Sequence, residues 1–394
     1  MKKGVATFTL DHGRCPPWLF NRMVNLGREM TRVLIEEYGP DEFVERISDP
    51  VWFQSLGTVL AFDWNASGLT TILTAALKEA IRGQERQFGI FICGGKGGTS
   101  RKTPDQIQFW GERISLPEKS TEQLITNSKM SAKVDSALVQ DGYTLYHHAF
   151  FFSKNGAWAV VQQGMNTNAK SARRYHWFDR LTTDNGQLTT DNETIDFVNE
   201  PHKAISAQTR HANVLNLVAG KSSKTRETSV DLIREGYKRV KSDLELLRKH
   251  SNEMSKVVAF SQDGEEYIAM ELSRNDFFHH PVELENFANS KYLDRILQKL
   301  SDRKPEDYKS LVSFQGVGPK TVRALSLVSE IIYGAMPSYI DPARYSFAHG
   351  GKDAIPYPVD RETYDKTIEI MRKAVNRSRI PFTDKQKALR RLAA

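Results

Sequence analysis

The sequence has few cysteines and no long apolar segment. Cys15 and Cys93 are the only cysteines in 394 residues, which is too few for a disulfide framework, a four-cysteine zinc site or a cysteine-ligated metal cluster. No run of about 18 apolar residues occurs, and the first residues lack an apolar segment of signal-peptide length. We therefore expect a cytoplasmic protein that does not contact a membrane.

Positive charge is concentrated near the C-terminal end. From Arg295 onward the chain has 19 Lys/Arg against 11 Asp/Glu, so this part carries about +8 and the rest about −1, within a total of +7. A basic region of this kind is typical of DNA-binding proteins, and a solvated basic surface gives the same count. The length allows two or three domains.

One segment in the basic region has the residues of a phosphate-binding turn. It reads Phe-Gln-Gly-Val-Gly-Pro-Lys-Thr from Phe314 to Thr321. The two glycines permit a tight turn, the proline suits the first position of a helix, and backbone N–H groups at a helix start suit an anion. The segment resembles the helix–hairpin–helix motif of DNA repair and recombination proteins, which holds the DNA backbone without reading its sequence. An ordinary helical hairpin is the alternative. The predicted DNA contacts are Gly316, Val317, Gly318, Lys320 and Thr321.

A second glycine-rich segment follows a predicted strand at residues 88–93. The run Gly94-Gly-Lys-Gly-Gly-Thr-Ser-Arg-Lys102 lacks the order of a P-loop, so it does not predict NTP hydrolysis. Its backbone amides could hold a DNA phosphate together with Lys96, Arg101 and Lys102. A flexible connection is an equally good interpretation.

The predicted elements indicate an α+β fold. Residues 143–163 predict a β-hairpin that turns at Lys154-Asn-Gly156. Residues 222–256 suggest one long, charged helix, and residues 261–266 a loop. We expect a mixed N-terminal domain whose sheet contains the hairpin, followed by a mainly α-helical domain with the helix–hairpin–helix.

Three regions follow from these elements. Residues 1–220 form the predicted catalytic domain, residues 221–290 a helical connection, and residues 291–394 a basic helical domain that contains the glycine turn.

The richest polar cluster lies between Lys129 and Trp177. The hairpin pairs His147 and His148 with Gln162 and Gln163 as cross-strand neighbours. Adjacent residues of a strand face opposite ways, so only one member of each pair can face a shared site. The spacing leaves open which one.

This cluster contains the parts that a nuclease requires. Asp135 and a histidine could hold a divalent cation that activates water, and a nearby lysine or arginine could neutralise phosphate oxygens. A basic, polar groove that only binds phosphates would use the same residue types.

The glycine turn also allows a different chemistry. In DNA glycosylases with this motif, a lysine after the hairpin glycines attacks the sugar and a later aspartate assists it. Lys320 and Asp341 stand at similar places here, although Pro342 follows the aspartate where a small or polar residue is expected. The alternative is that Lys320 contacts a phosphate and Asp341 caps a helix.

Long motifs in order along nearly the whole chain resemble domain-of-unknown-function family 763, found in bacteria and archaea. The motifs are Pro17-Trp-Leu-Phe20, Phe62-Asp-Trp64, Ser67-Gly-Leu-Thr-Thr71, Gly94-Gly-Lys-Gly97, Thr99-Ser-Arg-Lys-Thr-Pro104, Ser131-Ala-Lys-Val-Asp-Ser136, Asp141-Gly-Tyr143, Tyr146-His-His148, Val160-Val-Gln-Gln-Gly-Met-Asn166, Ala172-Arg-Arg-Tyr-His-Trp177, Gly316-Val-Gly-Pro-Lys-Thr321 and Asp341-Pro-Ala-Arg-Tyr-Ser-Phe-Ala-His-Gly-Gly-Lys-Asp353.

The resemblance implies a DNA nuclease that depends on Mn²⁺ or Mg²⁺ and acts on single-stranded or branched DNA, in DNA repair. Asp135 with His147 or His148 would hold metal or activate water. Lys133, Arg173 and Arg174 would neutralise the phosphate, and Gln163 and Asn166 would position it. A homodimer is possible. A DNA glycosylase/AP lyase that uses Lys320 and Asp341, or a non-catalytic DNA-binding scaffold, remains an alternative.

Overall fold

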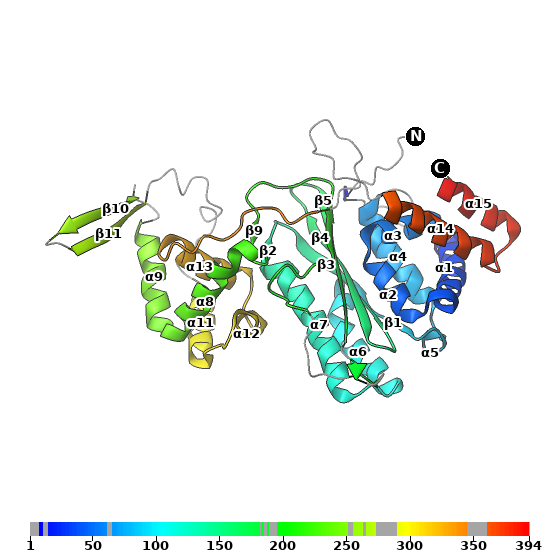
Figure 1. Cartoon of the computed structure of the whole chain (residues 1–394), viewed down its shortest axis with the longest axis horizontal. Helices are drawn as coiled ribbons and strands as arrows, with labels where there is room; N and C mark the ends of the chain where they lie inside the picture. Colours follow the sequence, from blue (N-terminus) through cyan, green and yellow to red (C-terminus); the bar gives the residue numbers. More distant parts are fainter. Residues whose placement is uncertain are drawn as a thin grey trace.

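The computed structural model describes residues 8–10, 15–60, 65–181, 183–184, 187–188, 195–250, 255–262, 265–272, 290–344 and 361–393. The fold is α+β, as predicted: helices cover both faces of an antiparallel sheet, and a separate group of helices lies at one end of the molecule (Figure 1). None of the helices within these ranges is long and apolar enough to cross a membrane.

The central sheet has five strands in the order β1-β3-β4-β5-β8. Every pairing is antiparallel, and β3 and β4 form the predicted hairpin around Lys154-Asn-Gly156, where Gly156 adopts a φ of 100°. His147 pairs with Gln163 and His148 with Gln162, which confirms the predicted register. The strands are β1 (Ile90–Lys96), β3 (Thr144–Ser153), β4 (Ala157–Asn166), β5 (Ser171–Arg180) and β8 (Ala204–Ala207).

The middle of this sheet is apolar on both faces. Phe151 and Val161 pack into one core cluster, and Phe150, Trp158 and Trp177 pack into another. When both faces of a sheet are covered, its strands are apolar at consecutive positions of the sequence, as in Ala149-Phe-Phe-Phe152. The first face packs against α2 (Pro40–Ser48) and α4 (Ala66–Ala80), which in turn pack against α1 (Pro17–Tyr38) and α3 (Pro50–Val59). The second face packs against α6 (Thr103–Arg113) and α7 (Glu118–Ala137).

Short elements connect these layers. They are α5 (Glu85–Phe88), η1 (Gly97–Lys102), β2 (Val139–Gln140), β6 (Thr183–Asp184), β7 (Gln187–Leu188), β9 (Leu215–Asn216) and η2 (Gly220–Ser222).

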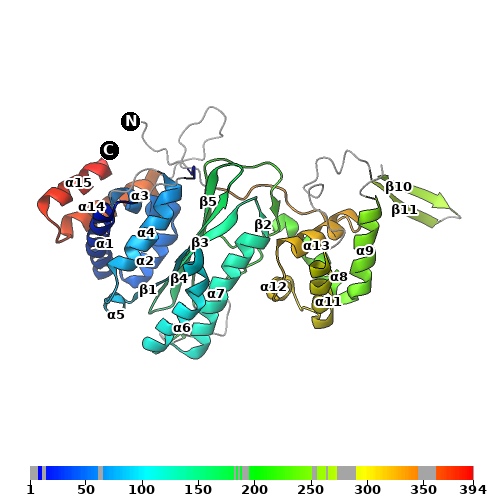
Figure 2. The ribbon, with the colours of Figure 1, turned by 180° about the vertical axis from the view of Figure 1, so that it is seen from behind.

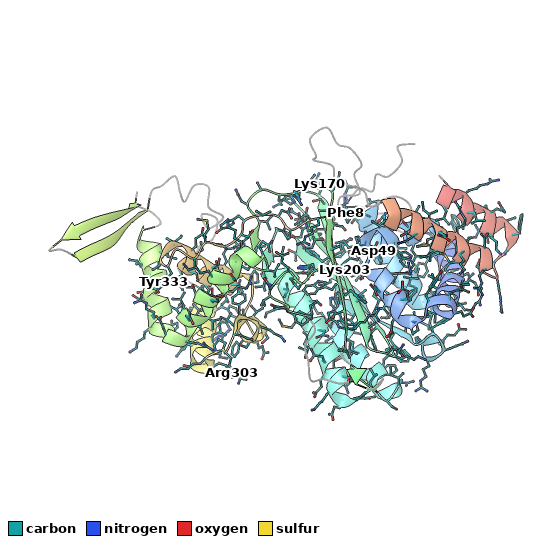
Figure 3. The ribbon with its side chains drawn as sticks, in the orientation of Figure 1. Phe8, Asp49, Lys170, Lys203, Arg303 and Tyr333 are labelled. Atoms are coloured by element: carbon teal, nitrogen blue, oxygen red, sulfur yellow. The ribbon has the colours of Figure 1, made fainter. Side chains whose placement is uncertain are left out.

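The helices at the end of the molecule pack into a helical body, whose apolar residues belong to the same core cluster as the α7 face of the sheet. They are α8 (Ser223–Glu235), α9 (Tyr237–His250), α11 (Lys291–Arg303), α12 (Tyr308–Ser313) and α13 (Pro319–Ile331). Figure 3 places Arg303 and Tyr333 in this helical body, whereas Phe8 and Asp49 lie on the part that contains the sheet.

Two predictions from the sequence are wrong for residues 222–272. The long helix is broken between α8 and α9, because Gly236 adopts a φ of 109° that ends α8. The predicted loop at 261–266 lies within a hairpin of β10 (Ser255–Gln262) and β11 (Glu265–Leu272), whose residues 263 and 264 are outside the described ranges.

The packing of the helices divides the chain differently from the predicted limits at 221 and 291. The helical body begins at α8, so the predicted connection supplies two of its helices. The last helices, α14 (Arg361–Arg377) and α15 (Phe382–Ala393), pack on α1 and α3, at the opposite end from the helical body (Figures 1 and 2). Between these parts the chain returns along the sheet, where Asn216 N donates to Ser338 O (2.8 Å) and Arg344 N donates to Ile205 O (3.0 Å).

Gly94 allows β1 to pass closely over β3. Its φ is 82°, and a Cβ atom there would lie 2.2 Å from the backbone oxygen of His148 and 2.5 Å from Thr103 Oγ1. Only glycine satisfies both the left-handed backbone and the close approach.

We therefore expect Gly94→Ala to lower the free energy of unfolding by about 2–4 kcal/mol. Urea unfolding at 25 °C measures it. Gly98→Ala is the matched control because a Cβ at Gly98 meets no atom within 4 Å, and it should change stability by less than about 1 kcal/mol. Equal effects of the two substitutions would contradict the close approach.

Candidate functional site

A pocket of about 250 Å³ opens between η1, the start of α6, the middle of α7, the first half of β3 and Gln162 of β4. Figure 2 shows α6 and α7 side by side over this part of the sheet. The residues that line the pocket are Ser100, Arg101, Thr103, Pro104, Ser128, Lys129, Ala132, Leu145, Tyr146, His147, His148 and Gln162.

The predicted glycine-rich phosphate segment forms one wall of this pocket. Gly94, Gly95 and Gly97 have φ values of 82°, 146° and 60°, which turn the chain sharply from β1 into η1. Arg101 lines the pocket, and Lys96 lies with its Nζ 5.9 Å from the centre of the Tyr146 ring. Lys102 is exposed and is not part of the wall. The wall therefore carries positive charge at its rim.

A chain of hydrogen bonds leads from the pocket into the core. Ser128 Oγ lies 2.9 Å from His148 Nε2, and His148 Nδ1 lies 2.8 Å from Gln162 Oε1. Gln162 Nε2 donates to Asp135 Oδ2 at 2.5 Å. Ser128 and Asp135 are seven residues apart on α7, so they lie on one face of that helix. This face packs against the sheet, and both side chains are almost fully buried.

The carboxylate of Asp135 is completely enclosed. Trp177 Nε1 donates to Oδ2 (2.9 Å), and His202 Nε2 bonds to Oδ1. Burial raises the pKa of Asp135, and the interactions with His202, Trp177 and Gln162 oppose this rise. Both oxygens therefore already have hydrogen-bond partners.

His148 is neutral at physiological pH. Burial lowers its pKa to about 4, and its hydrogen bond to Gln162 only partly opposes this effect. A neutral imidazole has one nitrogen that donates and one that accepts, so His148 can accept a hydrogen bond from a group in the pocket.

A second polar network lies on the opposite face of the sheet. His147 Nε2 lies 3.1 Å from Thr74 Oγ1 of α4. Gln163 Nε2 donates to the backbone oxygen of Ser67 (2.9 Å) and to the Tyr146 hydroxyl. Burial, together with the charges of His148 and Lys96, lowers the pKa of His147 to about 3. The two members of each His-His and Gln-Gln pair thus belong to different networks.

Arg174 also belongs to this second network. Its guanidinium lies 3.2 Å from Thr70 Oγ1 and 4.8 Å from the centre of the Phe53 ring. Burial lowers its pKa to about 9. Arg174 is absent from the pocket wall.

The residues predicted to hold a divalent metal do not fit one. Asp135 lies on the α7 face of the sheet and His147 bonds to α4 on the other, and both Asp135 oxygens accept hydrogen bonds from neighbours. Mg²⁺ and Mn²⁺ need several oxygen ligands with open lone pairs. In the described ranges, no group of three or more His, Cys, Asp or Glu side chains could hold a metal ion.

Arg173 occupies a buried ion pair away from the pocket. Its two terminal nitrogens donate to the two oxygens of Asp341 (2.9 and 2.6 Å), and Nη1 also donates to Asp141 Oδ2 (2.9 Å). Tyr175 donates to the same Asp141 oxygen (2.6 Å). The charge of Arg173 is balanced by these carboxylates, which argues against its predicted contact with a phosphate.

The same ion pair argues against Asp341 as the assisting aspartate of a glycosylase. Burial acts to raise its pKa, but the Arg173 guanidinium and the backbone N–H groups of His211 and Ala343 outweigh burial and lower the pKa. A carboxylate with all these donors is a weak base.

Two further residues predicted to belong to the site, Asn166 and Lys133, do not line the pocket. Asn166 ends β4, where its Oδ1 accepts from Ala169 N (2.9 Å), outside the pocket wall. Lys133 is half-buried on α7, and its Nζ lies 3.5 Å from the backbone oxygen of Phe314. Burial lowers the pKa of Lys133.

In the glycine turn, residues 314–318 connect the end of α12 to the start of α13. Gly316 has a φ of 96°, and its carbonyl accepts from the Tyr292 hydroxyl (2.9 Å). Val317 is buried, and Pro319 is the first residue of α13. A Cβ at Gly318 would meet no atom within 4 Å, so the backbone there faces open space. Lys320 is half-exposed, and Thr321 is buried.

Helix α7 connects the turn to the pocket. Lys129 lines the pocket, and Lys133, one helical turn further on, reaches the carbonyl of Phe314. Beyond the end of α7, Gln140 Nε2 donates to Pro319 O (3.0 Å) and Gln140 Oε1 accepts from Arg323 Nε (2.5 Å).

Ser128, Gln162 and His202 are site residues that the sequence reasoning did not select. Gln162 was indistinguishable from Gln163, and His202 is far away in sequence from Asp135. Ser128 could have been found from its seven-residue spacing to Asp135, because that spacing joins two polar residues on a helix face that also carries the buried apolar residue Leu124.

Comparison with known proteins identifies the family. The chain matches the family described as protein of unknown function (DUF763) over residues 4–359, so it belongs to that family. No curated protein and no solved structure matches it.

The ion pair of Arg173 yields a test of the structure. Arg173→Met leaves Asp141 and Asp341 buried without their cation, so we expect the free energy of unfolding at pH 7 to fall by about 3–5 kcal/mol. Urea unfolding measures this loss. Arg180→Met removes an exposed pair with Glu45 and should cost at most about 1 kcal/mol. A loss of under 1 kcal/mol in both variants would contradict the described pair.

Proposed function

We propose that this protein binds DNA at the Gly316–Lys320 turn and cleaves a phosphodiester in the pocket. The proposed DNA is single-stranded or branched, because a turn that holds the backbone recognises structure rather than bases. DNA repair is the proposed setting.

One observation carries this proposal: the basic pocket and the open turn lie at neighbouring places along α7. Arg101 and Lys129 give the pocket its positive rim, and Lys320 follows the open backbone of Gly318. A strand held by the turn could thus place a nearby phosphate at the pocket. Neutral His148 supplies a base there, which a surface that only binds phosphates does not need.

The other two classes of function receive less support. A glycosylase needs a free carboxylate near Lys320, and Asp341 is committed to Arg173. A non-catalytic scaffold explains the turn but gives no reason for the Ser128–His148 bond in a pocket. Dependence on Mn²⁺ or Mg²⁺ and formation of a homodimer stay predictions, and no catalytic step is assigned to a metal.

Gly318→Val tests the DNA-binding part of the proposal. Gly318 has φ −140° and ψ −175°, extended values that valine adopts readily and that a residue before proline prefers. The added side chain should leave the fold intact and keep a phosphate away from the backbone N–H groups. We expect the Kd for a labelled forked DNA, measured by fluorescence anisotropy, to rise by about tenfold or more, or about 1.4 kcal/mol.

Two lysine substitutions, one at the turn and one far from it, give a matched comparison of DNA affinity. Lys320→Ala should weaken binding and reduce the dependence of log K on log salt by about one unit, because one phosphate contact is lost. Lys387→Ala removes the same charge from α15 at the opposite end of the molecule (Figure 1) and should change neither quantity. Unchanged affinity in a well-folded Gly318→Val protein would refute binding at the turn.

His148→Gln tests cleavage. Glutamine retains hydrogen-bonding groups in the buried position but cannot accept a proton, so we expect cleavage of DNA containing single-stranded, forked and abasic sections to fall by about 10²–10⁴-fold. DNA affinity should be unchanged. Products would be separated on a denaturing gel. If the unaltered protein yields no product with or without Mn²⁺, the non-catalytic DNA-binding scaffold would be the function that remains.

A further inference from the structure

Ser128 makes an unusual hydrogen bond for a serine in a helix. A buried helical serine commonly bonds to the carbonyl four residues earlier, as Ser229 does with Thr225 and Ser329 with Leu325. The Ser128 hydroxyl instead bonds to His148 Nε2, 2.9 Å away across the pocket. Its oxygen is thus held next to a base.

Asp135 determines which group donates and which accepts in each of the hydrogen bonds from Ser128 through His148 and Gln162. The indole of Trp177 can only donate, so the carboxylate accepts, and the Gln162 amide nitrogen must also point at it. The Gln162 oxygen then faces His148 Nδ1, which must carry the ring proton. His148 Nε2 is left with a lone pair, and the Ser128 hydroxyl donates to it.

We propose that Ser128 is a nucleophile for phosphodiesters, with His148 as its general base and Gln162 and Asp135 as positioning residues. The inference takes its substrate class from the proposed function, and the basic rim of Arg101 and Lys129 suits a phosphate. A nucleophile, a histidine and a group that orients the histidine recur on unrelated folds, and the orienting group is an amide in the Cys-His-Asn proteases.

The reaction has two balanced steps. In the first, Ser128 Oγ forms a bond to phosphorus and its proton moves to His148 Nε2. The bond from phosphorus to the leaving sugar oxygen breaks, and that oxygen takes the proton from His148. In the second, water bonds to phosphorus and gives its proton to His148, the bond to Ser128 breaks, and the serine oxygen takes the proton back. Arg101 and Lys129 stabilise the added negative charge.

A small phosphorylating reagent tests Ser128 without DNA. Diisopropyl fluorophosphate should form a bond from phosphorus to Ser128 Oγ with loss of fluoride, detected by peptide mass spectrometry. We expect His148→Gln to slow this labelling by about 10²–10⁴-fold and Ser128→Ala to abolish it. Ser136→Ala, which removes an exposed serine of the same helix, should leave the rate unchanged. Circular dichroism confirms that each variant is folded.

Cleavage of DNA separates this inference from the proposed function. Ser128→Ala should lose cleavage and retain DNA affinity. Labelling of Ser128 that depends on His148, without any DNA cleavage, would support the nucleophile and refute the nuclease. If Ser128→Ala still cleaves DNA, or if His148→Gln does not slow the labelling of Ser128, the proposal that Ser128 is a nucleophile would be refuted.

Discussion

The enclosed carboxylate of Asp135 determines the arrangement around it. Its hydrogen-bond partners come from β4, β5 and the segment before β8, so a single side chain of α7 connects that helix to three parts of the sheet region. A buried carboxylate without such partners would cost several kcal/mol. These hydrogen bonds determine the orientation of the Gln162 amide and place the ring proton of His148 on Nδ1. The tautomer of His148, which lines the pocket, therefore depends on Asp135, which does not line it.

Paired polar residues reflect the two covered faces of the sheet. His147 and His148, Gln162 and Gln163, and Arg173 and Arg174 each send one side chain to the α1–α4 face and one to the α7 face, because neighbouring residues of a strand alternate. Each face consequently has its own network. The α7 face combines Asp135, His148 and Gln162 with a pocket, while Arg173 on the same face is neutralised by two aspartates.

Local patterns predicted much of the fold but little of how the site is assembled. The β3–β4 hairpin turn and its register follow from residues close together in sequence, and the structure agrees with both. The break at Gly236 was missed because the apolar spacing continues through it. The Asp341–Arg173 pair joins residues 168 positions apart, and the choice between His147 and His148 depends on which helix covers which face. Neither the Asp341–Arg173 pair nor the choice between the two histidines can be derived from the spacing of residues within one strand.

The course of the chain has a mechanical consequence. The helical body leaves the sheet region at residue 222 and its chain returns by residue 344, after which α14 and α15 complete the packing of α1 and α3. It is therefore an insertion held by two covalent tethers rather than an appended module on one linker. Two tethers and a core cluster shared with the α7 face of the sheet restrict twisting of the inserted helices against the sheet.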